Sequence, residues 1–277
     1  MCIILFSWQK NRHFPLVVAA NRDEFYQRPT SELSYWENSD IIAGRDLQAG
    51  GTWLGITPSG RFAAVTNFRQ VADMHNSYPL SRGKLCQNFL EGSMSPECYL
   101  EELADIAMET GGFNLLVSDS KTLGYGCNRF GTEEGEPYYD FKPHLPAGIY
   151  GLSNHRLDTP WPKIRQSKQL MTEFIASLAE SEQESLLNEE HRPHLINEEH
   201  LLPVITHSKE AADHELPDTG IGLDKERFLS PSFINSSMDY GTRASTILIR
   251  NDSGQQTIME QTWHPGGQTG VRTLVCL

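Results

Sequence analysis

The sequence predicts an α+β fold in which antiparallel sheets and helices form separate layers. Paired apolar runs open the chain, helical patterns follow in its middle, and strand-like runs return at its end. This order differs from the strict alternation of strand and helix that a parallel α/β sheet requires. With 277 residues, 38% of them hydrophobic, the chain has material for one core. We therefore expect a single domain over residues 1–277.

Two hairpins are predicted near the start of the chain. The runs CIILFSW and FPLVVAA are apolar and strand-like, and the polar turn QKNRH separates them. The runs TWLGI and RFAAVTN flank a second turn at Thr57-Pro58-Ser59-Gly60. Consecutive hairpins favour an antiparallel sheet, in which Cys2 begins a central strand.

Helices and further strands follow in order. Apolar residues recur at helical spacing between Leu80 and Thr110, and Ser95-Pro96 predicts the start of a second helix there. NLLVSD and TLGYGC form another hairpin-like pair, AGIYGLSN is a strand running into a loop, and a helix begins near Pro162. STILIR, TIMEQTW and VRTLVCL are the last strands. The polar, histidine-rich stretch from Glu180 to Asp218 is expected in exposed helices and loops.

Charge and cysteine content restrict the partners and the compartment. The chain has 36 acidic and 23 basic residues, and its net charge of -13 disfavours nucleic acids and anionic lipid surfaces. The first residues lack signal-peptide features and are too short an apolar run to span a bilayer, so no stable membrane insertion is expected. An odd number of cysteines without a C-x-x-C pair favours a reducing cytoplasm. These are Cys2, Cys86, Cys98, Cys127 and Cys276.

Cys2 is the first candidate for chemistry. A cysteine in an apolar strand is usually a small buried side chain, but Cys2 directly follows Met1, and a small second residue permits removal of the initiator methionine. The thiol would then lie beside a free α-amino group. With reference pKa values of about 8 and about 8.5, the amine and the thiol both titrate near physiological pH. A nucleophile and its base would share one residue.

A polar tetrad, Asn21 to Glu24, stands at the end of the second predicted strand. Such a cluster is often a solvated turn with a salt bridge. Here the wholly apolar run before it predicts a central strand, so the tetrad should lie at a sheet end close to Cys2. A guanidinium at this place would hold a thiolate, and a carboxylate would hold an ammonium group.

Six motifs spread from the first residue to the region of Ser245 resemble the NRDE family, also called the transport and Golgi organisation protein two family. They are MCIILF, AANRDEFYQRP, GGTWLGI, AAVTNFR, GLSN and YGTRAST. This family is a branch of the N-terminal-nucleophile (Ntn) hydrolase superfamily. The resemblance implies a four-layer αββα sandwich with two mainly antiparallel sheets.

Within that superfamily the chain is similar to cysteine acylases that cleave bile-salt conjugates and penicillin V. The resemblance implies that Cys2 is the nucleophile, that Asn67 helps to form the oxyanion hole, and that Asn154 is a second polar residue near the nucleophile. It also implies that Arg243 supports the site electrostatically. As plainer roles, the asparagines would end strands by tolerating left-handed turns, and Arg243 would form a structural ion pair.

The tetrad departs from the acylase pattern, in which arginine and aspartate are separated by two residues. Two alignments are open. Either Arg22 and Asp23 keep the acylase roles with altered geometry, or Asn21 and Glu24 occupy those places and Arg22 has a new role.

Metal, nucleotide and serine-hydrolase chemistry are not indicated. His191, His194, His200, His207 and His214 lie close in the sequence but match no catalytic zinc pattern, and no G-x-S-x-G elbow surrounds Ser153. The paired glycines do not form a phosphate-binding signature.

The resemblance therefore implies a cysteine hydrolase that cleaves the C–N bond of a small-molecule acyl amide and requires no cofactor. The alternative is a non-catalytic ligand carrier, because the NRDE family is associated with haem trafficking and homeostasis. His13, His155 and His264 are candidate haem ligands by residue type only. The expected partner is a small amide or haem, and the sequence is compatible with an oligomer. A membrane-organising role has no support from amphipathic or transmembrane sequence.

Overall fold

The computed structural model describes residues 2–71, 76–131, 135–187 and 198–277. Within these residues the strands form a six-stranded sheet A and a seven-stranded sheet B. Sheet A has the order β10-β1-β2-β11-β12-β13, made of β1 (Cys2–Trp8), β2 (Leu16–Phe25), β10 (Gly148–Leu152), β11 (Tyr240–Arg250), β12 (Gln256–His264) and β13 (Gln268–Cys276). Sheet B runs in sequence order, made of β3 (Thr30–Tyr35), β4 (Ile42–Asp46), β5 (Leu54–Ile56), β6 (Phe62–Asn67), β7 (Phe113–Ser118), β8 (Leu123–Phe130) and β9 (Tyr138–Lys142).

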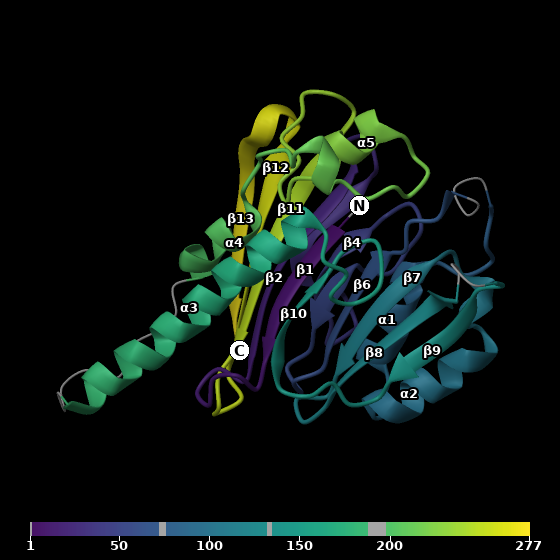
Figure 1. The fold of residues 1–277 in the computed structure, drawn as a ribbon. Helices are drawn as coiled ribbons and strands as arrows, with labels where there is room; N and C mark the ends of the chain where they lie inside the picture. The colour runs from purple at the N-terminus through teal and green to yellow at the C-terminus, as the bar shows by residue number, and fades with distance from the viewer. Residues whose placement is uncertain (1, 72–75, 132–134, 188–197) are drawn as a thin grey trace.

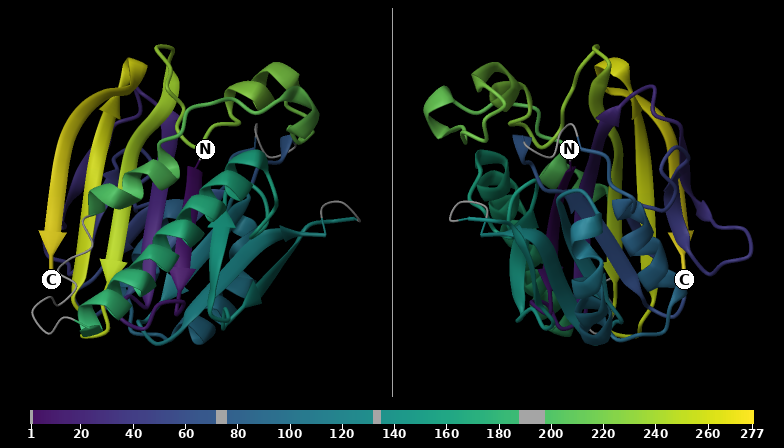
Figure 2. Two further views of the ribbon diagram at one scale, coloured as in Figure 1. Left: turned by 60° about the vertical axis from the view of Figure 1, so that its left-hand side comes forward. Right: turned by 90° about the vertical axis from the view of Figure 1, so that its right-hand side faces the viewer.

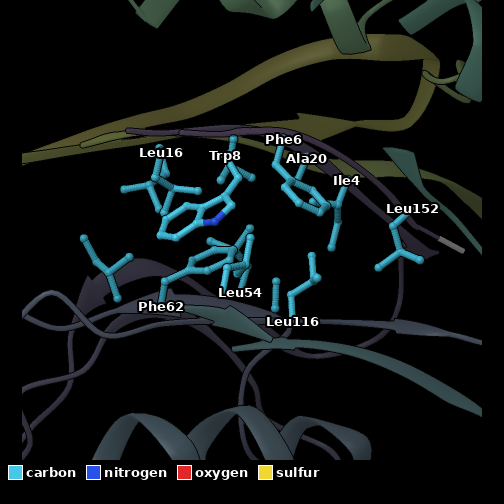
Figure 3. Close-up of a cluster of buried hydrophobic side chains, with 14 of the residues drawn as sticks. Ile4, Phe6, Trp8, Leu16, Ala20, Leu54, Phe62, Leu116 and Leu152 are labelled. Atoms are coloured by element: carbon cyan, nitrogen blue, oxygen red, sulfur yellow. The ribbon is translucent and has the colours of Figure 1, made fainter. Parts of the chain in front are cut away.

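The two sheets pack face to face across an apolar core. Ile4, Phe6 and Trp8 of β1 point toward sheet B, where they meet side chains such as Phe62 and Leu116 (Figure 3). The alternate residues of β1 point to the opposite face, because successive side chains of a strand alternate. Since both faces of β1 are buried, its sequence is a continuous apolar run rather than an alternating one.

Helices cover the outer face of each sheet. α1 (Arg82–Glu91) and α2 (Pro96–Glu102) pack on sheet B, where Leu85 and Phe89 are buried. α3 (Pro162–Leu187) and α4 (Leu202–Ile205) pack on sheet A, where Ile164 and Met171 are buried (Figures 1 and 2). Burying each such side chain contributes about 1.5–3 kcal/mol. The layer order is therefore αββα, and the predicted fold class is confirmed.

Most predicted elements are present, and β1 lies between β10 and β2 as expected for a central strand. Ser95 caps α2 by accepting a hydrogen bond from the Cys98 backbone N–H at 3.2 Å. β3, β4 and β9 were not predicted. β3 and β9 are edge strands with only one fully buried residue between them, so their sequences lack a strong apolar pattern.

The expectation that residues 180–218 are all exposed is wrong for part of the stretch. Leu201, Val204 and Ile205 are at most 2% exposed and pack on the outer face of sheet A. Their apolar side chains fill the space that α3 leaves over β2 and β11. His191 and His194 lie outside the described residues. Among the helices that the structure describes, none is long and apolar enough to cross a membrane.

Glu260 is a buried carboxyl between the sheets. It projects from β12, is 2% exposed and accepts a hydrogen bond from the Leu33 backbone N–H at 2.7 Å. Leu33 lies where the pairing of β3 with β4 is interrupted. Burial raises the pKa of Glu260 from 4.5 to about 7, although the Leu33 N–H acts in the opposite direction.

Replacing Glu260 with glutamine is expected to stabilise the protein by on the order of 3 kcal/mol near pH 8, because one pKa unit corresponds to about 1.4 kcal/mol. The native state binds the proton more tightly than the unfolded chain. This group's stabilising effect is therefore complete below pH 4.5 and is lost as the pH rises through about 7. Glutamine keeps an oxygen for the Leu33 N–H and does not titrate. Denaturant unfolding near pH 4 and pH 8 measures the difference, and an equal gain at both values would contradict the assignment.

Candidate active site

Five strand ends meet at one end of the sandwich. β1 begins there, and its antiparallel pairing brings the ends of β2 and β10 to the same edge. β11 begins beside the end of β2, and the end of β6 reaches this edge from sheet B. Figure 2 shows the N-terminus at this end, close to the segment that carries α5 (Leu223–Phe228). The strand ends border a cavity of about 1060 Å³ whose lining includes Cys2, Arg22, Asp23, Asn67 and Asn154.

The cavity wall combines aromatic and cationic side chains. The aromatic members are Phe25, Trp53, Phe68, Tyr78, Phe228 and Tyr240, and the cationic members are Arg22, Arg28, Arg69, Arg82 and Lys225. An apolar wall with a few fixed charges is typical of a small-molecule site. The arrangement suits a ligand that has both an apolar body and polar groups.

Cys2 is half-buried and lines the cavity. It lies directly opposite Arg22 in the β1–β2 ladder, and both side chains point to the side facing sheet B. Burial raises the pKa of the Cys2 thiol; Asp23 acts in the same direction, while Arg22 lowers it. At neutral pH this thiol is therefore protonated and needs a base before it can attack a carbonyl group.

Arg22 is held on the cavity wall by three contacts. Its guanidinium stacks over the Trp53 ring at 4.4 Å, donates to the Thr30 hydroxyl at 3.2 Å and lies 3.5 Å from the Asp46 carboxylate. Asp46 also accepts from Arg28 at 2.8 Å. Partial burial acts to raise the pKa of Asp46, but hydrogen bonds from the Ala49 backbone and Arg28 outweigh it and lower the pKa. The carboxylate thus stays charged and fixes both arginines.

Asp23 is on the opposite face of β2 from Arg22 and is 2% exposed. Its carboxylate accepts a hydrogen bond from the Thr242 hydroxyl at 2.7 Å, and its backbone carbonyl accepts one from the Tyr240 hydroxyl at 2.9 Å. Burial raises the pKa of Asp23, while Lys163 and the Thr242 hydroxyl lower it. The balance makes its ionisation sensitive to nearby cations.

The strand does not end before the tetrad, because β2 continues to Phe25. Alternation places Asn21 and Asp23 toward the helices, and Arg22 and Glu24 toward sheet B. The Asn21 amide donates to the carbonyls of Ile205 and Ser232, both at 2.7 Å, and does not line the cavity. Asn21 therefore ties β2 to the helical layer. Its placement favours the alignment in which Arg22 and Asp23 accompany Cys2.

Asn67 and Asn154 come together across the two sheets. The Asn154 amide donates to the Asn67 carbonyl at 2.8 Å, and the Ser153 hydroxyl donates to the Cys2 carbonyl at 2.9 Å. Thr66 adds a hydrogen bond from its hydroxyl to the Ser153 carbonyl at 2.6 Å. Within the described chain, no group hydrogen-bonds the Asn67 side-chain amide. Both asparagines are thus placed at the cavity beside Cys2, and their catalytic roles stay predictions.

Arg243 lies apart from the cavity lining. It occupies a break in the register of β11, where an extra residue redirects the side chain. Its guanidinium donates to the carbonyls of Arg28 and Phe25 and to the Thr30 hydroxyl. These contacts hold the turn between β2 and β3, on which Arg28 is carried. Arg243 is also close enough to Arg22, Glu24 and Asp46 of the cavity wall to interact with their charges, and its electrostatic role stays a prediction.

Sequence reasoning missed three charged residues around the site. Lys163 lies near both the Asp23 carboxylate and Arg69, and Glu226 pairs with Arg69. Glu226 is 4% exposed and also accepts from the Thr219 backbone N–H at 3.0 Å. This pairing holds residues 219–229, which include α5, against the cavity. The available signal was weak, namely a lysine in the first turn of an otherwise apolar-faced helix.

The candidate histidines do not line the cavity. His13 pairs with the Asp252 carboxylate at 2.7 Å, and His155 packs against the Phe68 ring at 4.9 Å, behind the cavity wall. His264 is exposed at the end of β12. In the parts of the chain that the structure describes, no three His, Cys, Asp or Glu side chains are grouped as metal ligands.

Comparisons with known proteins give a consistent family match. The family model described as Transport and Golgi organisation 2 matches residues 1–265. The Transport and Golgi organization protein 2 homologs of Bos taurus and Homo sapiens are each 32% identical, and each alignment covers 95% of this chain and 93% of the relative. The Drosophila melanogaster protein is 23% identical, with 95% and 92% covered.

Two solved structures are also similar to this chain. The Caenorhabditis elegans N-acylethanolamine-hydrolyzing acid amidase ortholog has a TM-score of 0.48 and 8% identity, with 90% of this chain and 92% of that chain covered. A mutant of the conjugated bile acid hydrolase from Clostridium perfringens has a TM-score of 0.45 and 9% identity, with 99% and 92% covered.

Proposed function

Since the chain belongs to the Transport and Golgi organisation 2 family, whose members are named for transport rather than for a reaction, we propose a chemistry from the geometry of its own site. The proposal is an N-terminal-nucleophile cysteine hydrolase that cleaves a small-molecule acyl amide after removal of Met1. One observation carries it. Cys2 begins a central strand, opens onto a cavity of about 1060 Å³ and lies opposite Arg22 in the ladder.

In this mechanism the α-amino group of Cys2 takes the thiol proton as Sγ attacks the amide carbonyl carbon. The tetrahedral intermediate collapses when the C–N bond breaks, and the ammonium group returns the proton to the leaving amine. Water then attacks the thioester, which releases the carboxylic acid and restores the thiol. The raised pKa of the thiol is compatible with this scheme, because the amine removes the proton during attack.

The asparagine pair supports the oxyanion. Asn67 lines the cavity, and its backbone carbonyl accepts a hydrogen bond from the Asn154 amide at 2.8 Å. An amide nitrogen carries two hydrogens, so Asn154 keeps one for a ligand while it holds Asn67. Fixed donors of this kind stabilise a developing oxyanion because they need no reorganisation during the reaction.

The test is alkylation of Cys2 across pH. Cys98 and Cys276 are exposed, whereas Cys86 and Cys127 are buried, so a Cys98→Ser/Cys276→Ser background leaves Cys2 as the accessible thiol of the five. Intact mass first establishes whether Met1 is absent. Iodoacetamide should then label Cys2 with a lower pH midpoint in the processed protein than in a form that retains Met1, because processing places the α-amino group beside the thiol. Cys2→Ala in the same background is the matched control.

Retention of Met1 on protein made in its own host would remove the base and overturn the proposal. Equal midpoints in the processed protein and in the form that retains Met1 would do the same. Selective labelling would instead justify a screen of small acyl amides, in which Cys2→Ala must be inactive.

A ligand carrier for haem is the second candidate, and the cavity lining favours it over other binding roles. Aromatic walls such as Trp53 and Phe68 would cover a flat apolar ring, and Arg82 would face anionic groups at its edge. Of the residue types that bind haem iron, the described lining offers the Cys2 thiol and the Tyr78 and Tyr240 hydroxyls. Titration with haemin should shift the Soret band at stoichiometric protein, and the absence of a shift excludes this role.

A further inference from the structure

Lys163 occupies an unfavourable place for a cation. It lies in the first turn of α3, where the helix dipole opposes positive charge, and it is 3% exposed. Its ammonium donates to the Leu229 carbonyl at 3.0 Å. A lysine kept solely for packing would have its charge in water, because its stem is long enough to reach the surface. A buried position with two electrostatic costs indicates that neighbouring charges hold the ammonium there.

The groups that face Lys163 come from five elements of the fold. In order of their effect on the pKa of Lys163, they are Asp23 of β2, Arg69 after β6, Cys2 of β1 and Glu226 of α5. The fifth is His207 after α4, whose own pKa is affected by the Lys163 charge. Burial lowers the pKa of Lys163 to about 8, and Asp23 is the strongest group acting to raise it. Burial and Lys163 also lower the pKa of His207 to about 4, so that imidazole is neutral. The Asp23 carboxylate is therefore the main counter-charge.

We infer that Lys163 is a positioning residue for the Cys2 nucleophile: its ammonium keeps the Asp23 carboxylate ionised and competes with the α-amino group of processed Cys2 for that carboxylate. This inference rests on the proposed function. It assigns to the helical layer a part in the reactivity of a thiol that opens on the other side of the sheet.

The competition has a definite direction. A cation close to an amine or a thiol disfavours the ammonium form of the amine and favours the thiolate. With Lys163 charged, the Cys2 amine stays a free base at lower pH. Without it, the Cys2 ammonium no longer shares the Asp23 carboxylate with the Lys163 ammonium, so the amine holds its proton to higher pH. Loss of Lys163 should therefore raise the pH at which Cys2 becomes reactive.

The experiment repeats the alkylation profile with Lys163→Met in the Cys98→Ser/Cys276→Ser background. The midpoint should rise by about one pH unit or more. Lys163→Arg keeps the charge and should bring the midpoint back toward that of the parent. Lys168→Met is the matched control, because Lys168 is on the same helix but pairs with Asp158 at 2.8 Å at the surface. It should leave the midpoint unchanged.

A second measurement needs no substitution. In protein labelled with ¹³C-lysine, the Lys163 side chain should titrate near pH 8, apart from the exposed lysines. Titration of every lysine in the ordinary range, or an unchanged alkylation midpoint in folded Lys163→Met, would overturn the inference while leaving Cys2 activation intact. Equal midpoints in the parent with and without Met1 would instead overturn the proposed function.

Discussion

Inserting a lysine between Met1 and Cys2 is expected to reduce amide hydrolysis by at least about 1000-fold, the scale of a lost general base. A long side chain in the second position blocks removal of the initiator methionine. The thiol remains in place, but the α-amino group is two residues away from it. The half-buried Cys2 thiol, whose pKa is raised by desolvation, then has no base attached to its own residue.

The readout is kcat/KM for an amide that the processed protein hydrolyses, compared with the extended form at equal concentration. Thermal unfolding shows that the extended protein is folded, and intact mass shows that the extension is retained. Cys98→Ser is the control for a cysteine on the surface and should hydrolyse normally. Full activity in the extended protein would show that the amine of Cys2 is not the base.

Replacing Glu226 with alanine is expected to destabilise the protein by about 4 kcal/mol. Arg69 is 9% exposed, stacks on Trp161 at 4.9 Å and pairs with Glu226. Without the carboxylate, a desolvated guanidinium remains, and the Thr219 N–H loses its acceptor. Because the Arg69–Glu226 pair holds residues 219–229 in place, the variant should be cleaved in this segment more readily in limited proteolysis.

A double-mutant cycle separates the pair from the surrounding packing. The cycle consists of the parent, Arg69→Met, Glu226→Met and the double variant, which removes both charges and should recover most of the stability that Glu226→Met loses. Glu215→Ala breaks the exposed Arg165–Glu215 pair and should cost less than about 1 kcal/mol. Denaturant unfolding measures the four proteins of the cycle and the Glu215→Ala control. Equal losses for the single and double variants would show that charge burial is not the cause.

The hairpin pattern at the chain start was sufficient to predict that Cys2 and Arg22 lie together. A short turn between two apolar runs forces antiparallel neighbours, so the end of β2 must return beside the start of β1. Asn67 and Asn154 reach the same place from two sheets, and only the family resemblance indicated them. No local pattern shows that the ends of β6 and β10 face each other.

Lys163 and Glu226 could not be predicted because their neighbours are set by packing rather than by spacing. Lys163 approaches Asp23 only when α3 covers sheet A, and Glu226 meets Arg69 only when α5 folds over the cavity. The expectation that residues 180–218 form exposed helices and loops was wrong in part for a related reason. Leu201 and Ile205 are apolar positions within a polar stretch, and their burial depends on a gap in the helical layer.

The tetrad Asn21 to Glu24 points to both faces of β2, so the site depends on which face each residue of this strand takes. Arg22 faces sheet B and Asp23 faces the helices because the ladder from Leu16 onward fixes which side each residue takes. Insertion of one residue within β2 would turn the arginine toward the helices and the carboxylate toward sheet B. Two inserted residues would restore both orientations. Extra residues in the turn at 9–15 lie outside the ladder and leave these orientations unchanged. Insertions of any length in the turn are thus compatible with this site, whereas insertions within β2 are compatible only when they add an even number of residues.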